Sequence, residues 1–327
     1  METNFIKNII HNLKMELLSI GYTDKKNFLK DLEKDILETN NLELIYTIYV
    51  EIADVDIDVY AKAIIDSKDP KYNYLLAKDL SKVKLVIGDK KVLLRQKYLG
   101  LCEKNVLDSK NLEYNYLFAK DIDKADESLH AKIILDSKDP KYNYLFAKDI
   151  RNSDIEAHEK VVLDSKNPEY NYLFATTIDS ADVEAHRKVV IDSQHPEYNY
   201  LFYEYDYDFD HKDVIYESRN PKYNYFLWEK YHDEFSLLLV RESQDLEYNT
   251  EIASNGWGKH RLPSKKIVLN SRRLEYICKL FTYNTFGCDS LGKFRKIGIK
   301  SKDPKYNYEL VKYICQNYLD INQYILR

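Results

Sequence analysis

Residues 136–147 read DSKDPKYNYLFA, and copies of this stretch recur through most of the chain. The serine at its second position marks each copy, and successive serines are separated by 42, 28, 28, 28, 25, 25, 28 and 30 residues. Self-similarity at a nearly constant period predicts an array of stacked units in place of a single globule. Clear copies begin at Asp66, Asp108, Asp136, Asp164, Asp192, Glu217, Glu242, Asn270 and Lys300, and a weaker copy begins at Glu38.

A period of 28 residues has room for two helices of about ten residues and two tight turns. Asp139 is placed to cap a first helix that starts at Pro140, where the missing N–H of proline costs nothing. Asp154 is placed to cap a second helix, and Asp126 and Asp182 occupy the same position in their units. The residues expected to face inward are Tyr142, Leu145, Phe146, Ile150, Ile155, Val161 and Val162. One hairpin has too little apolar surface to fold alone, so we expect an all-α solenoid of about ten stacked helix-turn-helix repeats.

The composition agrees with a cytoplasmic protein, located in the host cytoplasm if the chain is viral. Apolar residues make up 44% and charged residues 31% of the chain, with a net charge of −5. The apolar stretches are far shorter than the roughly 20 residues of a membrane span, and the first residues predict an amphipathic helix instead of a signal peptide. The spacing of the four cysteines is unlike that of metal sites and favours reduced thiols: Cys102, Cys278, Cys288 and Cys315.

Catalytic motifs are absent from the sequence. It contains no GxSxG, no GxxxxGK[ST] and no HExxH, and its carboxylates and histidines recur with the repeat. We therefore expect a protein that is not an enzyme and that carries no cofactor or metal.

Two polar residues recur in register with the repeat. The asparagine of YNY is interpreted as a ladder that satisfies backbone groups between repeats, with a polar stripe for a ligand as the alternative. A histidine recurs seven residues before the serine, at His130, His158, His186 and His211. Helices about 8–10 Å apart cannot bring such side chains together on one ion, so we expect a seam with one face wet. A pH-sensitive seam is the alternative.

Departures from the repeat divide the chain. Residues 1–34 are expected to form an N-terminal helical cap, residues 35–250 the repeat array, and residues 251–327 basic, irregular repeats with a helical cap. Within the array, residues 81–104 include an excess of 14 residues, and their sequence predicts a longer second helix.

Between residues 200 and 232 the spacing shortens to 25, and large rings replace the small residue of the motif. In the structural interpretation, these rings fill the space left by a shortened turn. The segment also combines acidic and aromatic side chains, which suits a basic protein partner. The candidate partner-binding residues are Tyr203, Glu204, Tyr205, Asp206, Tyr207, Asp208, Phe209, Asp210 and Trp228.

A calcium loop is an alternative for part of this segment. Asp206, Asp208, Asp210 and Glu217 match its positions 1, 3, 5 and 12. His211, however, stands where the sharp turn of such a loop needs glycine.

The C-terminal part is basic. Residues 259–305 contain 13 Lys and Arg against 3 acids, a net charge of +10, so the rest of the chain carries −15. Cations with interleaved aromatic rings are typical of single-stranded nucleic-acid binding, although an acidic protein surface or no ligand at all fits equally. The candidate residues are Trp257, Lys259, His260, Arg261, Lys265, Lys266, Arg272, Arg273, Lys293, Arg295 and Lys296.

The run SKDPKYNYLFAKDI at residues 137–150 resembles the tandem helical repeats of about 28 residues in uncharacterised bacterial, phage and giant-virus proteins. The resemblance covers roughly residues 35–314 and depends on the core SxDPxYxYxFA. It implies a helical array with a role in recognition. The chain departs from that pattern at 81–104, 203–213, 251–266 and 282–299.

Two functional hypotheses follow. The first is a non-enzymatic solenoid that binds a protein or nucleoprotein, of which a phage-type inhibitor of a host defence complex is one form. The alternative is an RNA- or single-stranded-DNA-binding protein that uses the basic C-terminal segment. The sequence does not define the partner or the oligomeric state.

Overall fold

The computed structural model describes residues 2–19, 22–52, 55–82, 90–255, 260–271 and 273–282, together with Tyr308. Within these residues the chain forms nineteen α-helices and no β-strand, and neighbouring helices pack in chain order. The predicted all-α repeat solenoid is thereby confirmed. The chain divides into two compact units, residues 1–189 and 190–327.

The first unit contains α1 (Glu2–Ser19), α2 (Tyr22–Glu38), α3 (Leu42–Glu51), α4 (Ile57–Ser67), α5 (Pro70–Ser81), α6 (Lys90–Ser109), α7 (Leu112–Asp121), α8 (Glu127–Ser137), α9 (Pro140–Asp149), α10 (Ile155–Ser165) and α11 (Pro168–Thr177). The second contains α13 (Pro196–Asp206), α14 (Phe209–Ser218), α15 (Pro221–Tyr231), α16 (Glu234–Glu242), α17 (Leu246–Asn255), α18 (Arg261–Ser271) and α19 (Leu274–Thr282). The helix between them, α12 (Val183–Asp192), runs across the division.

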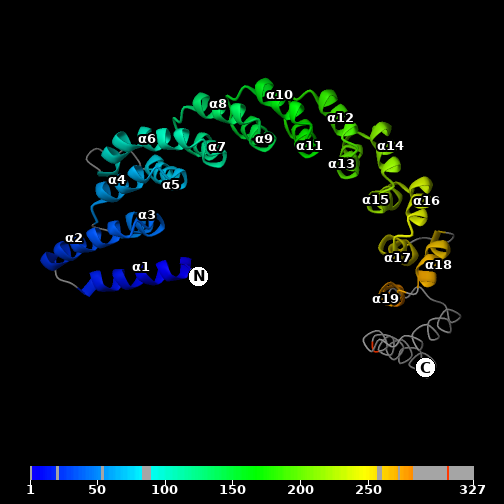
Figure 1. The fold of residues 1–327 in the computed structure, drawn as a ribbon, viewed down its shortest axis with the longest axis horizontal. Coiled ribbons are helices and arrows are strands. Elements are labelled where there is room, and N and C mark those ends of the chain that lie inside the picture. The colour runs from blue at the N-terminus through cyan, green and yellow to red at the C-terminus, as the bar shows by residue number, and fades with distance from the viewer. Residues whose placement is uncertain are drawn as a thin grey trace, which may run out of the picture. The chain divides into compact units, whose positions relative to one another are not determined.

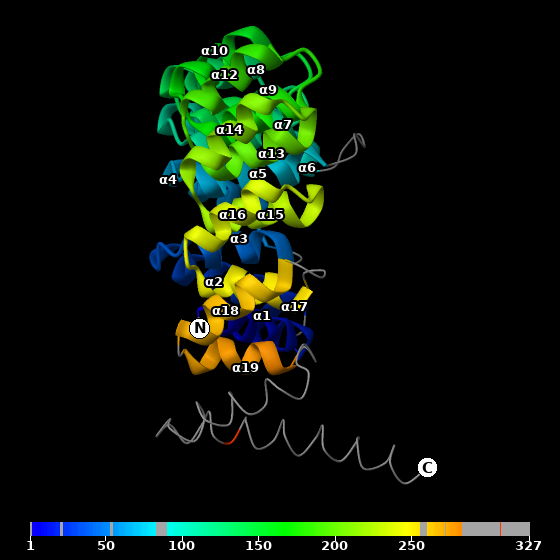
Figure 2. The ribbon, with the colours of Figure 1, turned by 90° about the vertical axis from the view of Figure 1, so that its right-hand side faces the viewer.

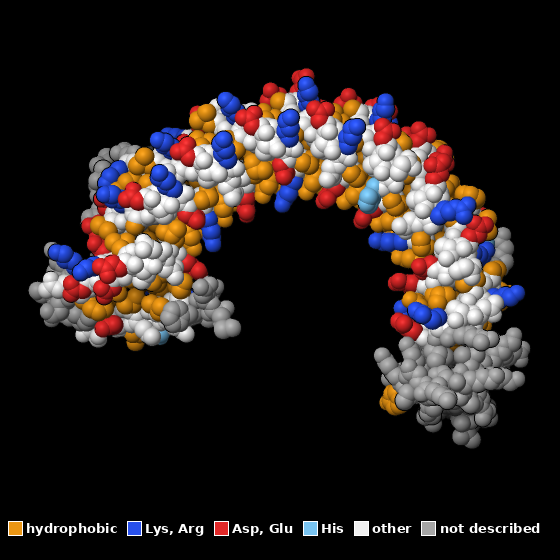
Figure 3. Space-filling model, viewed as in Figure 1, with side chains coloured by type: hydrophobic (Ala, Val, Ile, Leu, Met, Phe, Trp, Pro, Cys, Tyr) orange, Lys and Arg blue, Asp and Glu red, His pale blue; other side chains and the backbone are white. Residues whose placement is uncertain are grey.

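Each repeat consists of an odd-numbered helix and the even-numbered helix after it. Within the first unit, α7, α9 and α11 form one row and α8 and α10 form the other (Figures 1 and 2). On the face of these helices seen in Figure 3, Lys and Arg side chains are interspersed with Asp and Glu side chains.

The motif DSKDP forms the turn between repeats. The Ser137 hydroxyl donates to the Ile134 carbonyl at 2.6 Å and accepts from the Asp139 N–H at 3.1 Å. Lys138 takes the left-handed conformation (φ 55°) that ends α8, and the Asp139 carboxylate accepts from the Tyr142 N–H at 3.1 Å. Every motif serine from Ser67 to Ser271 makes the same bond to a carbonyl three residues earlier. The motif serine is therefore part of the scaffold.

The predicted caps of the second helices are also confirmed. The carboxylates of Asp126, Asp154 and Asp182 accept from backbone N–H groups three residues later, at 3.2, 3.1 and 3.0 Å. Such a bond satisfies one of the four donors that a helix N-terminus leaves unpaired.

The asparagine of YNY joins consecutive helices. The Asn143 amide donates to the Ile134 carbonyl at the end of α8 (3.0 Å) and to the Asp139 carbonyl before α9 (2.8 Å). Asn73, Asn115, Asn171, Asn199, Asn224 and Asn249 make the same two bonds, and all are fully buried. The ladder interpretation is confirmed for these repeats, while Asn307 lies outside the described residues.

The apolar interior is shared between neighbouring repeats. Phe146 and Ile150 of one repeat pack against Tyr116, Ala119 and Ile134 of the repeat before it. Because each cluster takes residues from two repeats, a hairpin depends on its neighbours for burial. Phe146 and Val162 are fully buried as predicted, whereas several other predicted inward residues are only half-buried: Tyr142, Leu145, Ile155 and Val161.

The structure describes two places where the sequence departs from the regular repeat. Helix α6 is 20 residues long, which confirms the longer second helix, although residues 83–89 lie outside the described part of the chain. The boundary predicted at residue 34 falls inside α2, since that helix continues to Glu38.

The change of period from 28 to 25 lies in one turn of the repeat. Between α9 and α10 the turn runs from Ile150 to Asp154, whereas between α13 and α14 it consists only of Tyr207 and Asp208. The turn between α15 and α16 is equally short, at His232 and Asp233.

Replacement of Asn143 by alanine tests the ladder. The change leaves the His158 N–H without its acceptor and removes a donor from the Ile134 carbonyl, so we expect a loss of about 2–4 kcal/mol in the free energy of unfolding. Urea unfolding gives the loss, and hydrogen exchange is expected to localise it to α8–α10.

The control for this prediction is Asn152→Ala in the exposed turn of the same repeat, with an expected effect within about 0.5 kcal/mol. Equal effects of the two substitutions would contradict a structural role for the ladder.

Candidate functional site

The histidine ladder lies in the interior. His130, His158, His186 and His211 are fully buried, so the expected seam with one wet face is wrong. In each case Nδ1 lies 2.7–2.8 Å from the oxygen of a ladder asparagine. Each ring also lies 4.8–5.2 Å from a phenylalanine ring, measured between centroids.

The asparagine determines which histidine nitrogen carries the proton. Because the Asn143 amide nitrogen already donates to two carbonyls, its oxygen is the atom that faces His158. The Nδ1 of His158 therefore donates, and the neutral ring suffices for this bond. Burial lowers the pKa of His158 to about 4, against a smaller opposing effect of Asp154.

The ladder is a packing solution instead of a ligand site. Where phenylalanine is replaced by an aliphatic residue, histidine is replaced as well, which gives the pairs Leu76 with Cys102, Leu227 with Ser236 and Ile252 with Ser264. All three small residues are fully buried. In the described part of the chain, no group of three metal-ligating side chains converges.

The pH dependence of stability follows from His158. The pKa of His158 is 6.5 in the unfolded chain and about 4 in the folded chain. The unfolded state therefore binds the proton first on acidification, and stability falls between these two pH values. From pH 7 to pH 5 the loss at His158 is about 2 kcal/mol. Urea unfolding at several pH values measures it.

The double variant Phe146→Leu with His158→Ser copies the pair Leu227 and Ser236 that the chain itself uses. It is expected to reduce the slope of stability against pH, whereas Phe146→Leu alone keeps the titrating ring and most of the slope. The same slope in both variants would show that His158 does not titrate as inferred.

The acidic-aromatic segment contains both buried and exposed residues. Tyr203 and Trp228 replace alanine of the regular repeats and are only 6% and 7% exposed, which favours a packing role for both. Glu204 accepts from Tyr200 and forms an ion pair with Lys230 at 2.7 Å.

The remaining acids of the segment divide by role. Asp206 accepts from the Asp208 N–H at 3.0 Å, and Asp208 caps α14 by accepting from the Asp210 N–H at 3.0 Å. Asp210 is exposed. Glu217 lies near the end of α14, so the four residues of the calcium interpretation do not form one loop, and no metal-ligating group was found among the described residues.

Aromatic rings gather at the two short turns. Tyr207, Phe209 and Phe235 are 57%, 70% and 51% exposed. The ring of Tyr207 lies 6.0 Å from that of Tyr231, and the ring of Tyr216 lies 4.9 Å from that of Phe235. We call these five side chains the aromatic patch. Tyr205 is also exposed, at 51%, but its recorded ring contact is with Phe202 instead.

A lysine underlies the aromatic patch. The Lys212 ammonium lies 5.9 Å from the Phe209 ring centre and 5.5 Å from that of Tyr216. It also pairs with Asp233 at 2.5 Å, and both side chains are largely buried. Burial alone would raise the pKa of Asp233, but bonds from Lys212 and the Ser236 N–H lower it overall.

Several residues of this surface were not predicted from the sequence: Tyr216, Tyr231, Phe235 and the pair of Lys212 with Asp233. The second interval of 25 residues could have indicated them. It places a short turn between α15 and α16 at the same point of the repeat as the short turn between α13 and α14.

The predicted basic segment is described only in part. Arg261 donates to the Ala253 carbonyl at 2.8 Å. The pKa of Lys265 is lowered mainly by burial and to a smaller extent by the positive charge of Arg261. Lys266 and Arg273 are exposed, while His260 lies 3.4 Å from the Glu234 carboxylate. The other predicted residues lie outside the described residues: Trp257, Lys259, Arg272, Lys293, Arg295 and Lys296.

Comparison with known proteins found no matching family model, no matching curated protein and no matching solved structure. In the described part of the chain, no helix has both the length and the apolar character needed to cross a bilayer.

Proposed function

We propose that this chain is a non-enzymatic binding protein whose helical repeats recognise a protein or nucleoprotein partner. The observation that supports the proposal is the aromatic patch, in which Tyr207, Phe209 and Phe235 remain about half or more exposed. Aromatic side chains are enriched at protein interfaces and supply large contact areas at low entropic cost.

The charges beside the aromatic patch indicate the kind of partner. Asp210, Asp213 and Glu217 are exposed along α14, whereas Lys212 on the same helix is already paired with Asp233. A basic segment of another protein would therefore meet exposed acids on the helix that carries Phe209 and Tyr216. We propose such a segment as the occupant of the aromatic patch.

The triple variant Tyr207→Asn, Phe209→Ser and Phe235→Ser tests this surface. Asparagine is chosen at position 207 because that residue has φ 60°, which asparagine tolerates. The partner is first recovered by affinity purification with nuclease present and is then purified. We expect the triple variant to weaken its binding at least about tenfold in calorimetry.

The matched control is Leu101→Ser with Leu129→Ser, which removes apolar side chains that are 45% and 47% exposed in the first unit. Binding by the control is expected to match that of the unmodified chain. A triple variant that binds as tightly as this control would refute the aromatic patch as the docking surface.

A second candidate function is binding of RNA or single-stranded DNA by the basic segment. It is supported by the exposed Lys266 and Arg273 and by Arg261, whose charge adds to the effect of burial in lowering the pKa of Lys265. Positive charge concentrated in this way attracts phosphates and gives binding that weakens steeply with salt.

Lys266→Glu with Arg273→Glu is expected to weaken oligonucleotide binding at low salt and to flatten its salt dependence. The exposed pair Lys160→Glu with Lys188→Glu makes the same charge change in the first unit and is the control. If fluorescence anisotropy detects no binding of any oligonucleotide at low salt, the second function is eliminated.

A further inference from the structure

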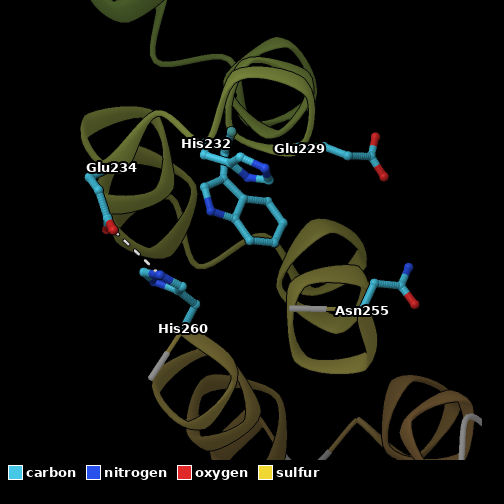
Figure 4. A pocket seen from close by; sticks show the side chains of 6 residues that line it. Glu229, His232, Glu234, Asn255 and His260 are labelled. Atoms are coloured by element: carbon cyan, nitrogen blue, oxygen red, sulfur yellow. Dashed lines mark ion pairs between the residues drawn. The ribbon is translucent and has the colours of Figure 1, made fainter. Parts of the chain in front are cut away.

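A pocket of about 450 Å³ opens in the second unit beside the second short turn. Its lining residues come from α15, α16 and α17, from the short turn, and from the residue just before α18: Trp228, Glu229, His232, Glu234, Asn255 and His260. Glu234 points toward His260, whereas Glu229 and Asn255 project from α15 and α17 on another side (Figure 4). The volume lies within the range of about 300–1,000 Å³ that is typical of ligand sites.

The short turn forms one edge of the pocket. His232 ends α15 with φ 55°, in the position that Tyr207 occupies one repeat earlier, and its side chain is exposed. Trp228 occupies the place of alanine in the regular repeats and contributes an aromatic ring to the lining. The regular repeats have alanine in place of the large ring, and a buried isoleucine such as Ile150 ends the helix in place of the exposed residue.

The carboxylates of the lining are held in place. Glu229 accepts from the Tyr225 hydroxyl at 2.8 Å, and burial followed by this bond raises the pKa of Tyr225, so the phenol keeps its proton. Glu234 lies 3.4 Å from His260, whose carbonyl accepts from the Arg241 guanidinium at 2.7 Å. The two carboxylates therefore line different sides of the pocket, and each has a contact with a neighbouring side chain.

Two described cations near the pocket, Lys230 and Arg241, already have partners. Lys230 pairs with Glu204 at 2.7 Å, and Arg241 is directed to the His260 carbonyl and to Ser264. Because these two described cations are engaged elsewhere, an anionic ligand would meet the two carboxylates of the lining. A metal ion is not favoured either, because no three metal-ligating side chains converge among the described residues.

We propose that this pocket binds a cationic head group, the guanidinium of arginine or the ammonium of lysine. An aromatic ring with carboxylates is the combination that attracts such groups, through charge-assisted hydrogen bonds and cation–π contact. That the cation belongs to the protein partner rests on the proposed function, since the basic segment expected at the aromatic patch would carry it. The cation site itself does not depend on that function.

Fluorescence of Trp228 tests the pocket directly. Trp257→Phe leaves Trp228 as the single tryptophan of the chain. The probes are N-acetyl-arginine amide, N-acetyl-lysine amide and a heptapeptide of Gly and Ser with a central Arg. N-acetyl-citrulline amide is the neutral isostere, and N-acetylglutamate is the anion.

We expect saturable changes with the cationic probes and at least about tenfold weaker binding of the citrulline compound, as the loss of a charged hydrogen bond predicts. We expect the double variant Glu229→Gln with Glu234→Gln to weaken binding of the cationic probes by a similar factor. Equal responses to the arginine and citrulline compounds would overturn the cation site.

The control variant is Glu242→Gln with Glu247→Gln, which removes the same charge at the far end of α16 and at the start of α17. An equal loss of cation binding in this control would show that only the net charge of the protein matters, and would overturn the cation site. If the free amino acids bind but the peptide does not, the ligand is a small cation instead of a protein side chain. If the cations bind normally but the Gln variant leaves partner affinity unchanged, the pocket stands and its assignment to the partner fails.

Discussion

The buried asparagine of each repeat connects the end of one helix to the start of the next. Asn143 holds the Ile134 carbonyl of α8 and the Asp139 carbonyl before α9 with two hydrogen bonds from one amide group. Helix ends leave carbonyls without intrahelical partners, and the Ile134 carbonyl accepts from the Ser137 hydroxyl as well as from this amide. The Asp139 carbonyl also accepts from the Asn143 N–H, so the amide adds a direct link between the end of α8 and the start of α9. Stacking of apolar side chains then proceeds from a defined geometry.

Histidine extends this junction into the interior of the repeat. With the amide nitrogen occupied, the asparagine oxygen is available to a donor, and the Nδ1–H of His158 supplies it at 2.8 Å. The same ring packs on Phe146, so one side chain serves both a polar and an apolar contact. In the repeat with Leu227 and Ser236, Asn224 still makes both carbonyl bonds. The two carbonyl bonds are therefore the constant part of the junction, and the ring pair is one of its variants.

Much of the scaffold was predictable because local sequence motifs and the constant period determine it. Asp139 before Pro140 defines a helix start, and the constant period defines the partner of each hairpin. The burial of His158 was not predictable from spacing, since a polar residue on the inner face is compatible with a wet seam or with a buried bond. The choice depends on the oxygen of Asn143, which reaches the ring only in the folded repeat.

The candidate site was predictable only in its first half. The run from Tyr203 to Asp210 is recognisable as acidic and aromatic, but burial separates Tyr203 and Trp228 from the exposed Tyr207 and Phe209. Phe235 comes from the following repeat and reaches the aromatic patch through its contact with Tyr216. Such a contact depends on how two short turns are stacked, which no local sequence pattern states.

The shortened period links the scaffold to the proposed recognition surface. In a regular repeat, Ile150 ends the helix as a buried residue and a further four residues complete the turn. Without that turn, a larger ring fills the interior at Trp228, and a left-handed residue, His232, ends the helix with an exposed side chain. One local deletion thus changes both the packing beneath the surface and the side chains on it. Because the ladder asparagines on either side keep their bonds, the array accommodates this change without losing its junctions.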